Sequence, residues 1–498
     1  MTSSSPRSAA SLPSHSTVER LPGSDVPPER RHPAAALRAA RNTPALTAFV
    51  IGALAALLVA HAGGTKIFYF DSGGYWYLSE SFTWSGHFSF YNFQDALRGY
   101  SWPLILWTLR NVSEVFMSNQ SLMVQGFNAT VFALVGAVLA PRLAAIAWPR
   151  VSWNITRRLV LTAIILVYWS GYLSFPLSDF PALAAALLAL VAVYRADSPA
   201  WLLVAGLAGA LALNIRPAYV LLPPVLIVLL AWSWIEGRNT QSISTRRRVL
   251  CIVALLAGLA IVSVPQSLSH HKHYGGFDPI PGSSDLQRLQ YTSGLKLQRY
   301  ETYVNTKPHI DYLDPHTDEI VAGLKSGSVE GTGEYLGLVI DHPLTMAGVF
   351  LRHVVNGFDQ RYTSPFVETL ESNRSGTSAA WHLLLRIGGF LMVFLALARV
   401  VWPAGRRSLE PARWRYAAAL LVCAASSVPS AIETRFLLPG YLLAAMLVVA
   451  PGWRKAFRET WAGPARNRAL ALVLTAAAVY GAVVWTIVSA ASDNLHVS

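Results

Sequence analysis

The sequence predicts an all-α polytopic membrane protein with about eleven transmembrane helices and a mixed extracytoplasmic loop domain. The 498-residue chain is 53% hydrophobic and only 13% charged, whereas soluble proteins carry about 25% charged residues. Apolar windows of roughly 17–23 residues recur along it, long enough to cross a hydrocarbon core of about 30 Å. The 16 Trp and 19 Tyr residues suit a protein with two membrane interfaces, where amphipathic rings collect.

Taken in order, the elements begin with residues 1–44, which are rich in Ser, Pro, Ala and Arg. Because this stretch has no apolar period, we expect a disordered cytoplasmic tail. The apolar run that follows starts too deep in the chain for an ordinary secretory signal, so it is predicted to be the first span. We place the spans near residues 45–62, 120–140, 158–175, 178–194, 199–215, 217–235, 249–266, 381–402, 416–431, 436–451 and 469–491.

Charge predicts the orientation of these spans. With the N-terminus in the cytoplasm, the inner segments hold 25 of the 40 basic residues but only 7 of the 27 acidic ones, as the positive-inside rule requires. The C-terminus is then outside, and the net charge of +13 implies no nucleic-acid partner. The apolar stretch 101–118 is predicted to be an interfacial helix, since a twelfth span there would place the basic cluster at 141–158 outside.

Two of the predicted outer segments are large, residues 63–119 and residues 267–380, and the second could fold as a small cap over the membrane domain. The large loop contains an amphipathic helix at 343–357, and Cys251 and Cys423 lie inside apolar runs, so no disulfide framework or cysteine metal site is expected. The predicted regions are the tail at 1–44, a transmembrane domain at 45–266 with a first extracytoplasmic loop at 63–119, an extracytoplasmic loop domain at 267–380, and C-terminal transmembrane helices at 381–498.

Asp71 is the first candidate catalytic residue. It follows the first span in Lys66-Ile-Phe-Tyr-Phe-Asp-Ser-Gly-Gly-Tyr-Trp-Tyr-Leu, a single carboxylate among six aromatic residues that include Tyr75. Apolar surroundings are expected to raise the pKa of this carboxyl toward values useful for a general base. The alternative is that Asp71 caps a helix that begins near Gly73.

Further lone charges lie in the predicted outer turns. Arg98, in Arg98-Gly-Tyr-Ser-Trp-Pro, stands beside Tyr100 and suits a phosphate or sugar contact, or else snorkels to the interface. Asp179 is the one charge in the turn between the third and fourth spans, where it either acts chemically or caps the next helix.

Two more outer turns carry charges, one with Arg216 and the other with Glu433 and Arg435. Glu433 and Arg435 are expected to pair with each other or to contact a substrate. His271 belongs to a His-His-Lys-His run after the seventh span, whose spacing matches no zinc signature. We interpret this run as a polar cluster or a contact to lipid phosphate.

Together these residues resemble the membrane glycosyltransferases of the GT-C fold. The resemblance rests on the first-loop Asp71 followed by Tyr75, on the Arg-x-x-x-x-Pro stretch that starts at Arg98, and on the Glu-x-Arg-Phe-x-x-Pro turn at Glu433. It covers roughly residues 45–451. That class includes protein O-mannosyltransferases, lipid A aminoarabinose transferases and mycobacterial arabinofuranosyltransferases.

The resemblance implies a multi-pass enzyme of the cytoplasmic (inner) membrane with an extracytoplasmic active site. It would transfer a hexosyl or pentosyl unit from a polyprenyl-phosphate donor to a glycan, lipid or protein acceptor of the cell envelope. Asp71 would act as the base on the acceptor hydroxyl or position it, and Asp179 matches a second acidic position. The residues that would hold the donor are Arg98, Arg216 and Arg435, with Glu433 orienting Arg435, and Tyr75, Tyr100 and His271 as further substrate contacts.

The sequence departs from the class at one point. Many members have two adjacent acids in the first loop, whereas here Asp71 is followed by Ser72. Because a single carboxylate is a poor site for Mg²⁺ or Mn²⁺, we predict no cofactor and no metal dependence, with a divalent metal as the alternative.

Two rival functions stay open at this point. A lipid or sugar transporter would suit the many spans, although the acidic residues avoid span interiors. An O-antigen polymerase or ligase would use arginine and histidine of the late loop, for which Arg352 and His353 are candidates beside the His271 run.

Overall fold

The computed structural model describes residues 33–64, 66–116, 119–149, 151–236, 244–280, 284–304, 309–401, 411–450 and 466–497. Contacts divide the chain into one unit at residues 1–43 and a second at 44–498, which holds every site discussed below. Most of the predicted tail, residues 1–32, lies outside the described residues. Helix α1 begins at Pro33, so the last part of residues 1–44 is helical, and the predicted domain boundaries stay a prediction.

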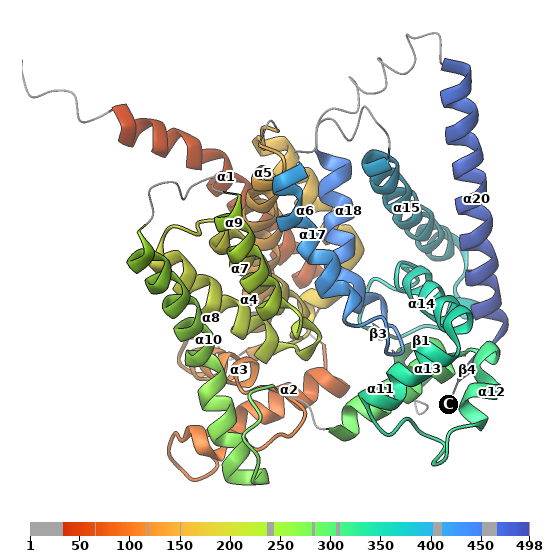
Figure 1. The fold of residues 1–498 in the computed structure, drawn as a ribbon, viewed down its shortest axis with the longest axis horizontal. Helices are drawn as coiled ribbons and strands as arrows, with labels where there is room; N and C mark the ends of the chain where they lie inside the picture. The colour runs from red at the N-terminus through yellow and green to blue at the C-terminus, as the bar shows by residue number, and fades with distance from the viewer. Residues whose placement is uncertain are drawn as a thin grey trace, which may run out of the picture. The chain divides into compact units, whose positions relative to one another are not determined.

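The N-terminal half of the protein is helical (Figure 1). A π-helical turn, Leu134–Leu139, joins α4 to α5. The helices are α1 (Pro33–Ala62), α2 (Phe70–Glu80), α3 (Ser101–Phe116), α4 (Gln120–Ala133), α5 (Ala140–Ala147), α6 (Ile155–Trp169), α7 (Asp179–Val193), α8 (Pro199–Ile215), α9 (Leu222–Ile235) and α10 (Thr245–Tyr274).

The C-terminal half adds short strands to further helices. Its elements are α11 (Ser284–Lys296), β1 (Leu297–Tyr303), β2 (His309–Leu313), α12 (Asp318–Ala322), α13 (Thr332–Asp341), α14 (Pro343–Gly357), β3 (Phe366–Val367), α15 (Gly376–Val401), α17 (Pro411–Ala425), α18 (Leu438–Val449), α20 (Arg466–Asp493) and β4 (Leu495–Val497). The amphipathic helix predicted at 343–357 is confirmed as α14.

Six helices among the described residues are long and apolar enough to cross a membrane, so the chain is an integral membrane protein. Helices α13 and α14, which meet at 111°, would make a seventh span if they form one broken span. The six are Thr43–Ala62, Gln120–Ala147, Pro217–Ile235, Thr245–Tyr274, Gly376–Val401 and Leu470–Asp493, each at a predicted span.

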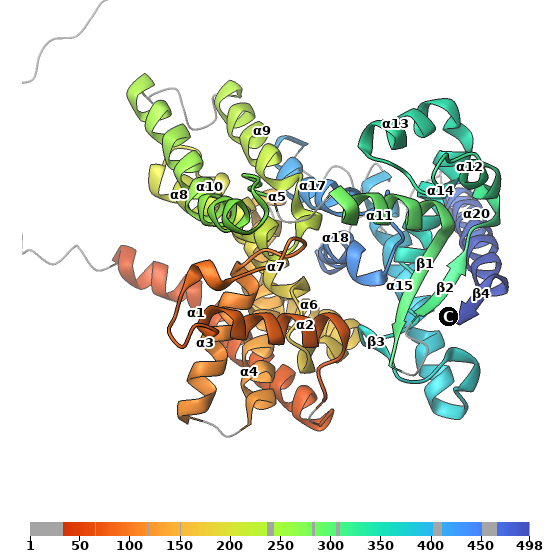
Figure 2. The same ribbon diagram turned by 90° about the horizontal axis from the view of Figure 1, so that it is seen from below.

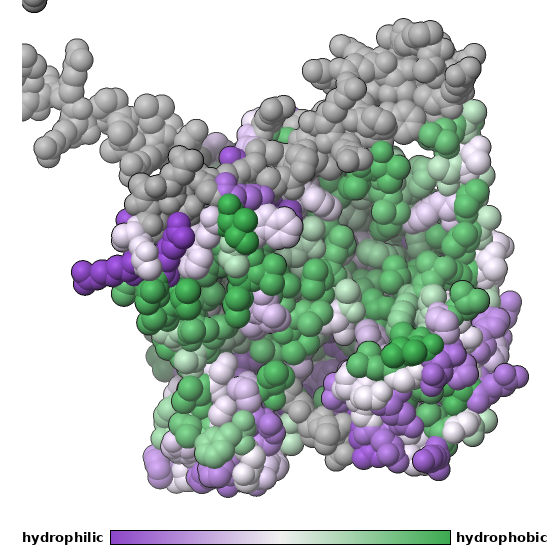
Figure 3. Space-filling view, viewed as in Figure 1, coloured by the Kyte–Doolittle hydropathy of each residue, from purple (hydrophilic) through white to green (hydrophobic). Residues whose placement is uncertain are grey.

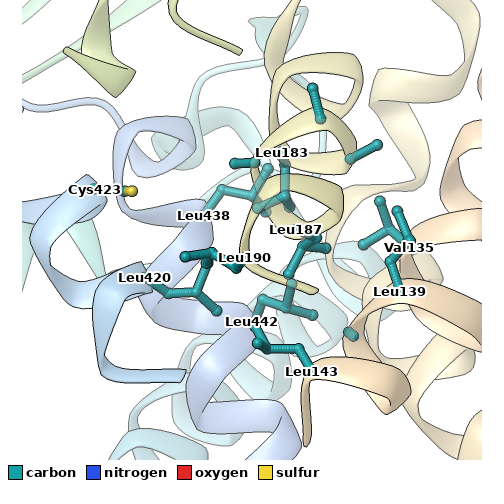
Figure 4. Packing of buried hydrophobic residues seen from close by; sticks show 14 of the residues in the cluster. Val135, Leu139, Leu143, Leu183, Leu187, Leu190, Leu420, Cys423, Leu438 and Leu442 are labelled. Atoms are coloured by element: carbon teal, nitrogen blue, oxygen red, sulfur yellow. The ribbon is translucent and has the colours of Figure 1, made fainter. Parts of the chain in front are cut away.

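The other five predicted spans fall on shorter helices, α6, α7, α8, α17 and α18, so the total of eleven stays a prediction. Helix α7 shows why composition alone does not decide how many helices span the membrane. Nearly every residue around α7 is buried, as expected for a helix that is apolar on all sides and lies inside a bundle. Figure 4 shows this packing, in which Leu183, Leu187 and Leu190 of α7 face Leu420, Leu438 and Leu442 of α17 and α18.

The outer helices expose apolar side chains instead. On the face seen in Figure 3, hydrophobic residues extend across the middle and hydrophilic residues gather at the lower end. Val253 of α10 is 54% exposed, Leu384 of α15 is 61% exposed and Trp485 of α20 is 74% exposed. An exposed apolar surface of this kind is what contact with lipid requires.

We call residues 284–304 and 309–367 the cap. They contain α11 to α14 and strands β1 to β3, which form with the C-terminal strand β4 a small sheet of order β3-β1-β2-β4 (Figures 1 and 2). Strand β1 pairs antiparallel with β2 and parallel with β3. The C-terminal strand β4 pairs antiparallel with β2. The C-terminus and the cap therefore lie on the same side of the helical region.

A buried group of charges ties the cap to α15. Asp359, whose side chain is fully buried, lies 2.5 Å from Arg361 Nε, 2.8 Å from Arg386 Nε and 3.7 Å from Arg299 Nη1. We call these four residues the Asp359 cluster. Since Arg386 belongs to α15 and Arg299 to β1, the cluster joins three separate parts of the chain.

Candidate functional site

Helix α2 positions the predicted base. Helix α2 begins at Phe70, earlier than the predicted start near Gly73, so Asp71 lies in the first turn of the helix. The carboxylate oxygens of Asp71 do not cap the helix but accept hydrogen bonds from arginines. Asp71 and Tyr75 are four residues apart and share one face of α2. Tyr75 also contacts Ser178, with the two hydroxyl oxygens 3.4 Å apart.

The loop that carries Arg98 is held against α10 and against the end of α8. The Tyr100 N–H donates to the Gln266 side chain at 3.2 Å, and the Ser101 N–H donates to the Asn214 side chain at 2.9 Å. A Cβ at Gly99 would lie only 1.9 Å from the Asn214 carbonyl oxygen. Glycine is therefore required here by the close approach of the two chains.

Asp71 joins two arginines that are distant in the sequence. Arg98 Nη2 donates to Asp71 Oδ1 at 3.0 Å, and Arg435 Nη2 donates to Asp71 Oδ2 at 3.2 Å. The Asp71 side chain is still 42% exposed. Both of its oxygens are thus engaged, yet the group remains open to a ligand.

The two arginines reverse the expected pKa of Asp71. Burial by itself raises this pKa, as the sequence predicted, but the charges and hydrogen bonds of Arg435 and Arg98 outweigh burial and lower the pKa below its ordinary value. The expectation of a raised pKa is therefore wrong. Asp71 is a carboxylate whose basicity is suppressed by its partners.

The cap holds the turn that carries Arg435. The Tyr300 N–H donates to the Ile432 carbonyl at 3.1 Å, and Arg299 Nη2 donates to Thr434 Oγ1 at 3.1 Å. Arg435 in turn pairs with Glu433, with Nε 2.5 Å from Oε2. Sequence reasoning missed Tyr300 and Arg299, since nothing local connects β1 with a turn more than 130 residues later.

Asp179 and Arg216 form an ion pair at the start of α7 and just after α8. The Asp179 side chain is 1% exposed and that of Arg216 is 13% exposed. A direct catalytic role would need Asp179 to reach a substrate, and its buried side chain does not do so. The structure instead places Asp179 behind Arg216, whose guanidinium lies 5.0 Å from the ring of Phe436.

These side chains meet at one cavity of about 600 Å³. Five of the nine residues predicted from the sequence line it, although they come from four separate segments. They are Asp71, Tyr75, Arg98, Arg216 and Arg435. Of the charged side chains that line this cavity in the described part of the chain, three are thus arginines and one is a carboxylate.

The other predicted residues lie elsewhere. Asp179 and Glu433 stand behind two of the arginines. Tyr100 is buried and donates to the Val262 carbonyl at 3.3 Å. His271 stacks on Phe277, with ring centroids 3.9 Å apart, and does not line the cavity.

Several lining residues were not predicted. The most distinctive are Gln287, Gln290 and Tyr291 of α11, whose i, i+3, i+4 spacing is the one sequence signal that indicates a shared helix face.

A second cavity of about 530 Å³ lies near β3, where Lys66 Nζ and Glu368 Oε1 pair at 2.8 Å.

Nothing in the described residues assembles a ligand set of three or more His, Cys, Asp or Glu side chains. The positive charge available at the cavity comes from arginine, which binds phosphate through paired N–H groups.

No protein-family model and no curated protein sequence matches the chain. It is similar to the archaeal oligosaccharyltransferase AglB from Archaeoglobus fulgidus, in complex with an inhibitory peptide and a dolichol-phosphate, at 12% identity and a TM-score of 0.40. That match covers 90% of this chain but 56% of AglB, so this chain spans little more than half its length.

A second similar structure is ArnT from Cupriavidus metallidurans bound to undecaprenyl phosphate, at 15% identity and a TM-score of 0.32, covering 81% of this chain and 76% of ArnT.

Proposed function

We propose that this integral membrane protein is a GT-C-type glycosyltransferase that transfers a sugar from a polyprenyl-phosphate donor. One observation carries the proposal, namely that three arginines and one carboxylate from separate segments converge on a single cavity among apolar helices. The leaving group of such a reaction is an anionic phosphate, and the acceptor is a hydroxyl that must lose its proton. A cation clamp and a base are the two functions required.

The arginines are suited to a phosphate because each is already fixed by a carboxylate. Arg98 lies 3.6 Å from Asp95, Arg216 pairs with Asp179, and Arg435 pairs with Glu433. Donors held in place before the reaction stabilise developing charge without having to reorganise. The guanidiniums would therefore hold the phosphate and stabilise it as it leaves.

Asp71 would become the base only after the donor binds. A phosphate that accepts the N–H groups of Arg98 and Arg435 competes with Asp71 for them. The pKa of Asp71 then rises, because burial is no longer offset by two hydrogen-bonded cations. In the transfer, the bond from the anomeric carbon to phosphate breaks, the acceptor oxygen bonds to that carbon, and its proton passes to Asp71.

The cavity also offers an apolar wall for the lipid. Leu97, Val220, Ile280 and Phe436 line it, and Val220 and Ile280 are 36% and 43% exposed. Side chains of this kind suit the first isoprenoid unit of the carrier. Charge asymmetry along the chain favours an extracytoplasmic site, with an envelope glycan, lipid or protein as acceptor.

The polymerase or ligase alternative gains no support from its candidate residues. The two ring nitrogens of the fully buried His353 lie 2.6 Å from the Val428 carbonyl oxygen and 3.0 Å from that of Leu297. Arg352 Nε donates to Asp314 at 2.8 Å. Both side chains are occupied by contacts within the protein, so neither is presented to a substrate.

The test is to incubate the purified protein with synthetic polyprenyl-phospho-sugars, one donor at a time, and to measure the release of free polyprenyl phosphate. We expect release from wild type and its loss in Asp71→Asn. Lys66→Gln, in the second cavity, is the matched control and should release normally. No release from any donor would overturn the proposal, and diphosphate-linked oligosaccharides would then be tested as substrates of a polymerase or ligase.

A further inference from the structure

Helix α11 contributes one wall of the Asp71 cavity. Gln287, Gln290 and Tyr291 line the cavity and share one helix face. We call these three residues the neutral wall. They belong to the cap, next to β1 (Figure 2), whereas none of the arginines that line the cavity comes from α11.

The neutral wall is firmly seated. A Cβ at Gly294 would lie 2.3 Å from the Pro429 carbonyl oxygen, so α11 packs directly against the backbone of the loop that precedes Glu433. Tyr335 donates a hydrogen bond to the same carbonyl at 3.3 Å, and its ring stacks on Tyr291 with centroids 4.4 Å apart. The backbone of α11 and the Tyr291 ring are therefore held at a set place relative to the cavity.

These polar groups suit hydroxyls. Gln287 Nε2 donates to the Tyr291 hydroxyl at 3.0 Å, which leaves the Gln287 carbonyl oxygen to accept. The Gln290 side chain is exposed, and its side-chain amide makes no hydrogen bond within the described part of the chain. An amide both donates and accepts, as a sugar hydroxyl does. The same loop adds uncharged hydroxyls to the lining, from Ser426, Ser427 and Ser430.

The charges of the cavity disfavour a charged sugar. Among the described lining residues, Asp71 is the one acidic side chain, and once the donor phosphate has taken over its two arginines it is assigned to the acceptor hydroxyl, not to the sugar. An ammonium group on the sugar would be desolvated without a free counterion and close to three guanidiniums, which is unfavourable. A carboxylate on the sugar would compete with the donor phosphate for those guanidiniums.

From this geometry we propose that the transferred unit is an uncharged sugar, and that the neutral wall selects it against amino sugars and uronic acids. The inference rests on the proposed function and names the substrate class of the same site. Gln287 and Gln290 would bind sugar hydroxyls directly, which makes them specificity-determining residues.

The test is a competition between matched donors. Purified protein receives equal amounts of polyprenyl phosphates that carry a neutral pentose or hexose, its amino-deoxy counterpart, or the corresponding uronic acid. Consumption of each donor is followed by mass spectrometry. We expect the neutral donor to be consumed at least about tenfold faster, in line with the cost of an unpaired buried charge.

Glutamate substitution sharpens the test. Gln290→Glu and Gln287→Glu are expected to narrow or reverse the preference for the neutral donor over the amino sugar, because each supplies the missing counterion. Two variants are used in case one fails to fold, with the unfolding midpoint as the check on folding. Gln287→Ala and Gln290→Ala should slow the neutral donor most, which reduces its advantage over the two charged donors.

The outcomes separate the two proposals. Equal or faster use of the amino-sugar or uronic-acid donor would overturn the neutral-sugar inference, while the accompanying release of polyprenyl phosphate would uphold the glycosyltransferase. Glutamate variants that fold but leave the donor preference unchanged would also overturn it, since the neutral wall would then not face the sugar. No release from any donor would overturn both proposals.

Discussion

Two groups of arginines around an aspartate occur in this protein, and they differ in what surrounds them. Asp71 contacts Arg98 and Arg435 and is 42% exposed at a cavity. Asp359 contacts its own arginines and is fully buried. In both groups burial raises the carboxyl pKa and the arginines outweigh it. The same contact between an aspartate and arginines therefore occurs once in a buried structural cluster and once at an open cavity.

The difference lies in whether the partners can be exchanged. In the Asp359 cluster every charge is met by another part of the chain, so the cluster joins the cap to α15. At Asp71 an incoming anion can reach the arginines and take the place of the carboxylate. Substitutions at the two groups should therefore separate a structural cluster from a ligand-binding one.

The largest effect is expected on stability at the buried cluster. Asp359→Asn leaves three arginines without their shared counterion and should destabilise the protein by about 3–5 kcal/mol, the usual cost of breaking a buried ion pair. The measurement is unfolding of the detergent-solubilised protein. Asp71→Asn is the matched control, and its exposed carboxylate should matter far less. Equal destabilisation by the two variants would remove the distinction.

A comparable effect, on catalysis instead of stability, is expected at the cavity. Arg216→Ala removes one of the cations assigned to the phosphate and should slow release of polyprenyl phosphate by roughly 10²–10³-fold, as loss of one charge-stabilising donor does in other enzymes. The unfolding midpoint shows whether the variant is folded. Wild-type turnover by a properly folded Arg216→Ala protein would refute this role.

Acid should weaken the buried cluster. The arginines lower the pKa of Asp359 from 3.8 to about 2, although burial opposes them. A carboxyl whose folded pKa is depressed stabilises the protein above its unfolded pKa and loses that contribution as the pH falls toward the folded value. About 2 kcal/mol of unfolding free energy should thus be lost between roughly pH 4 and pH 2. If Asp359→Asn loses stability over the same range to the same extent, Asp359 is not the cause.

The second cavity should give small effects. Lys66 and Glu368 pair at 2.8 Å, but their side chains are 32% and 51% exposed. Exposed pairs of this kind contribute about 0–1 kcal/mol, so Lys66→Gln and Glu368→Gln should leave both stability and donor turnover nearly unchanged. A strong loss of turnover in either variant would move the catalytic function toward this cavity.

Chelation should have no effect. Because arginines supply the positive charge at the Asp71 cavity, EDTA is expected to leave the release of polyprenyl phosphate unchanged. The measurement compares turnover before and after EDTA, with Mg²⁺ and Mn²⁺ added back afterwards. Loss of turnover in EDTA together with recovery on metal addition would refute metal independence.

How far the sequence predicts this site follows from where its residues lie. Asp71, Arg98, Arg216 and Arg435 are visible because each lies at the border of an apolar run, where charges are costly. What was missed depends on distant pairing. The pKa of Asp71 was expected to rise because its sequence neighbours are aromatic, whereas Arg435, which lowers it, lies 364 residues away.

The fold was predictable to a similar degree. Long apolar runs indicate helices, and all six of the long candidate spans were located. A buried apolar helix such as α7 looks the same in composition as a lipid-facing one, so the number of spans does not follow from the runs. The sheet of the cap was not predicted, since its four strands come from separate segments and the last lies at the C-terminus.

The central claim is that Asp71 and the donor phosphate compete for the same arginines. The most direct test is to measure the affinity of purified wild type and Asp71→Asn for undecaprenyl phosphate by native mass spectrometry, with Arg435→Gln as the control. Competition predicts that Asp71→Asn binds undecaprenyl phosphate as tightly as wild type or more tightly, although its turnover is lost, and that Arg435→Gln binds it weakly. Loss of binding in Asp71→Asn would contradict the claim, because Asp71 would then be needed to hold the phosphate.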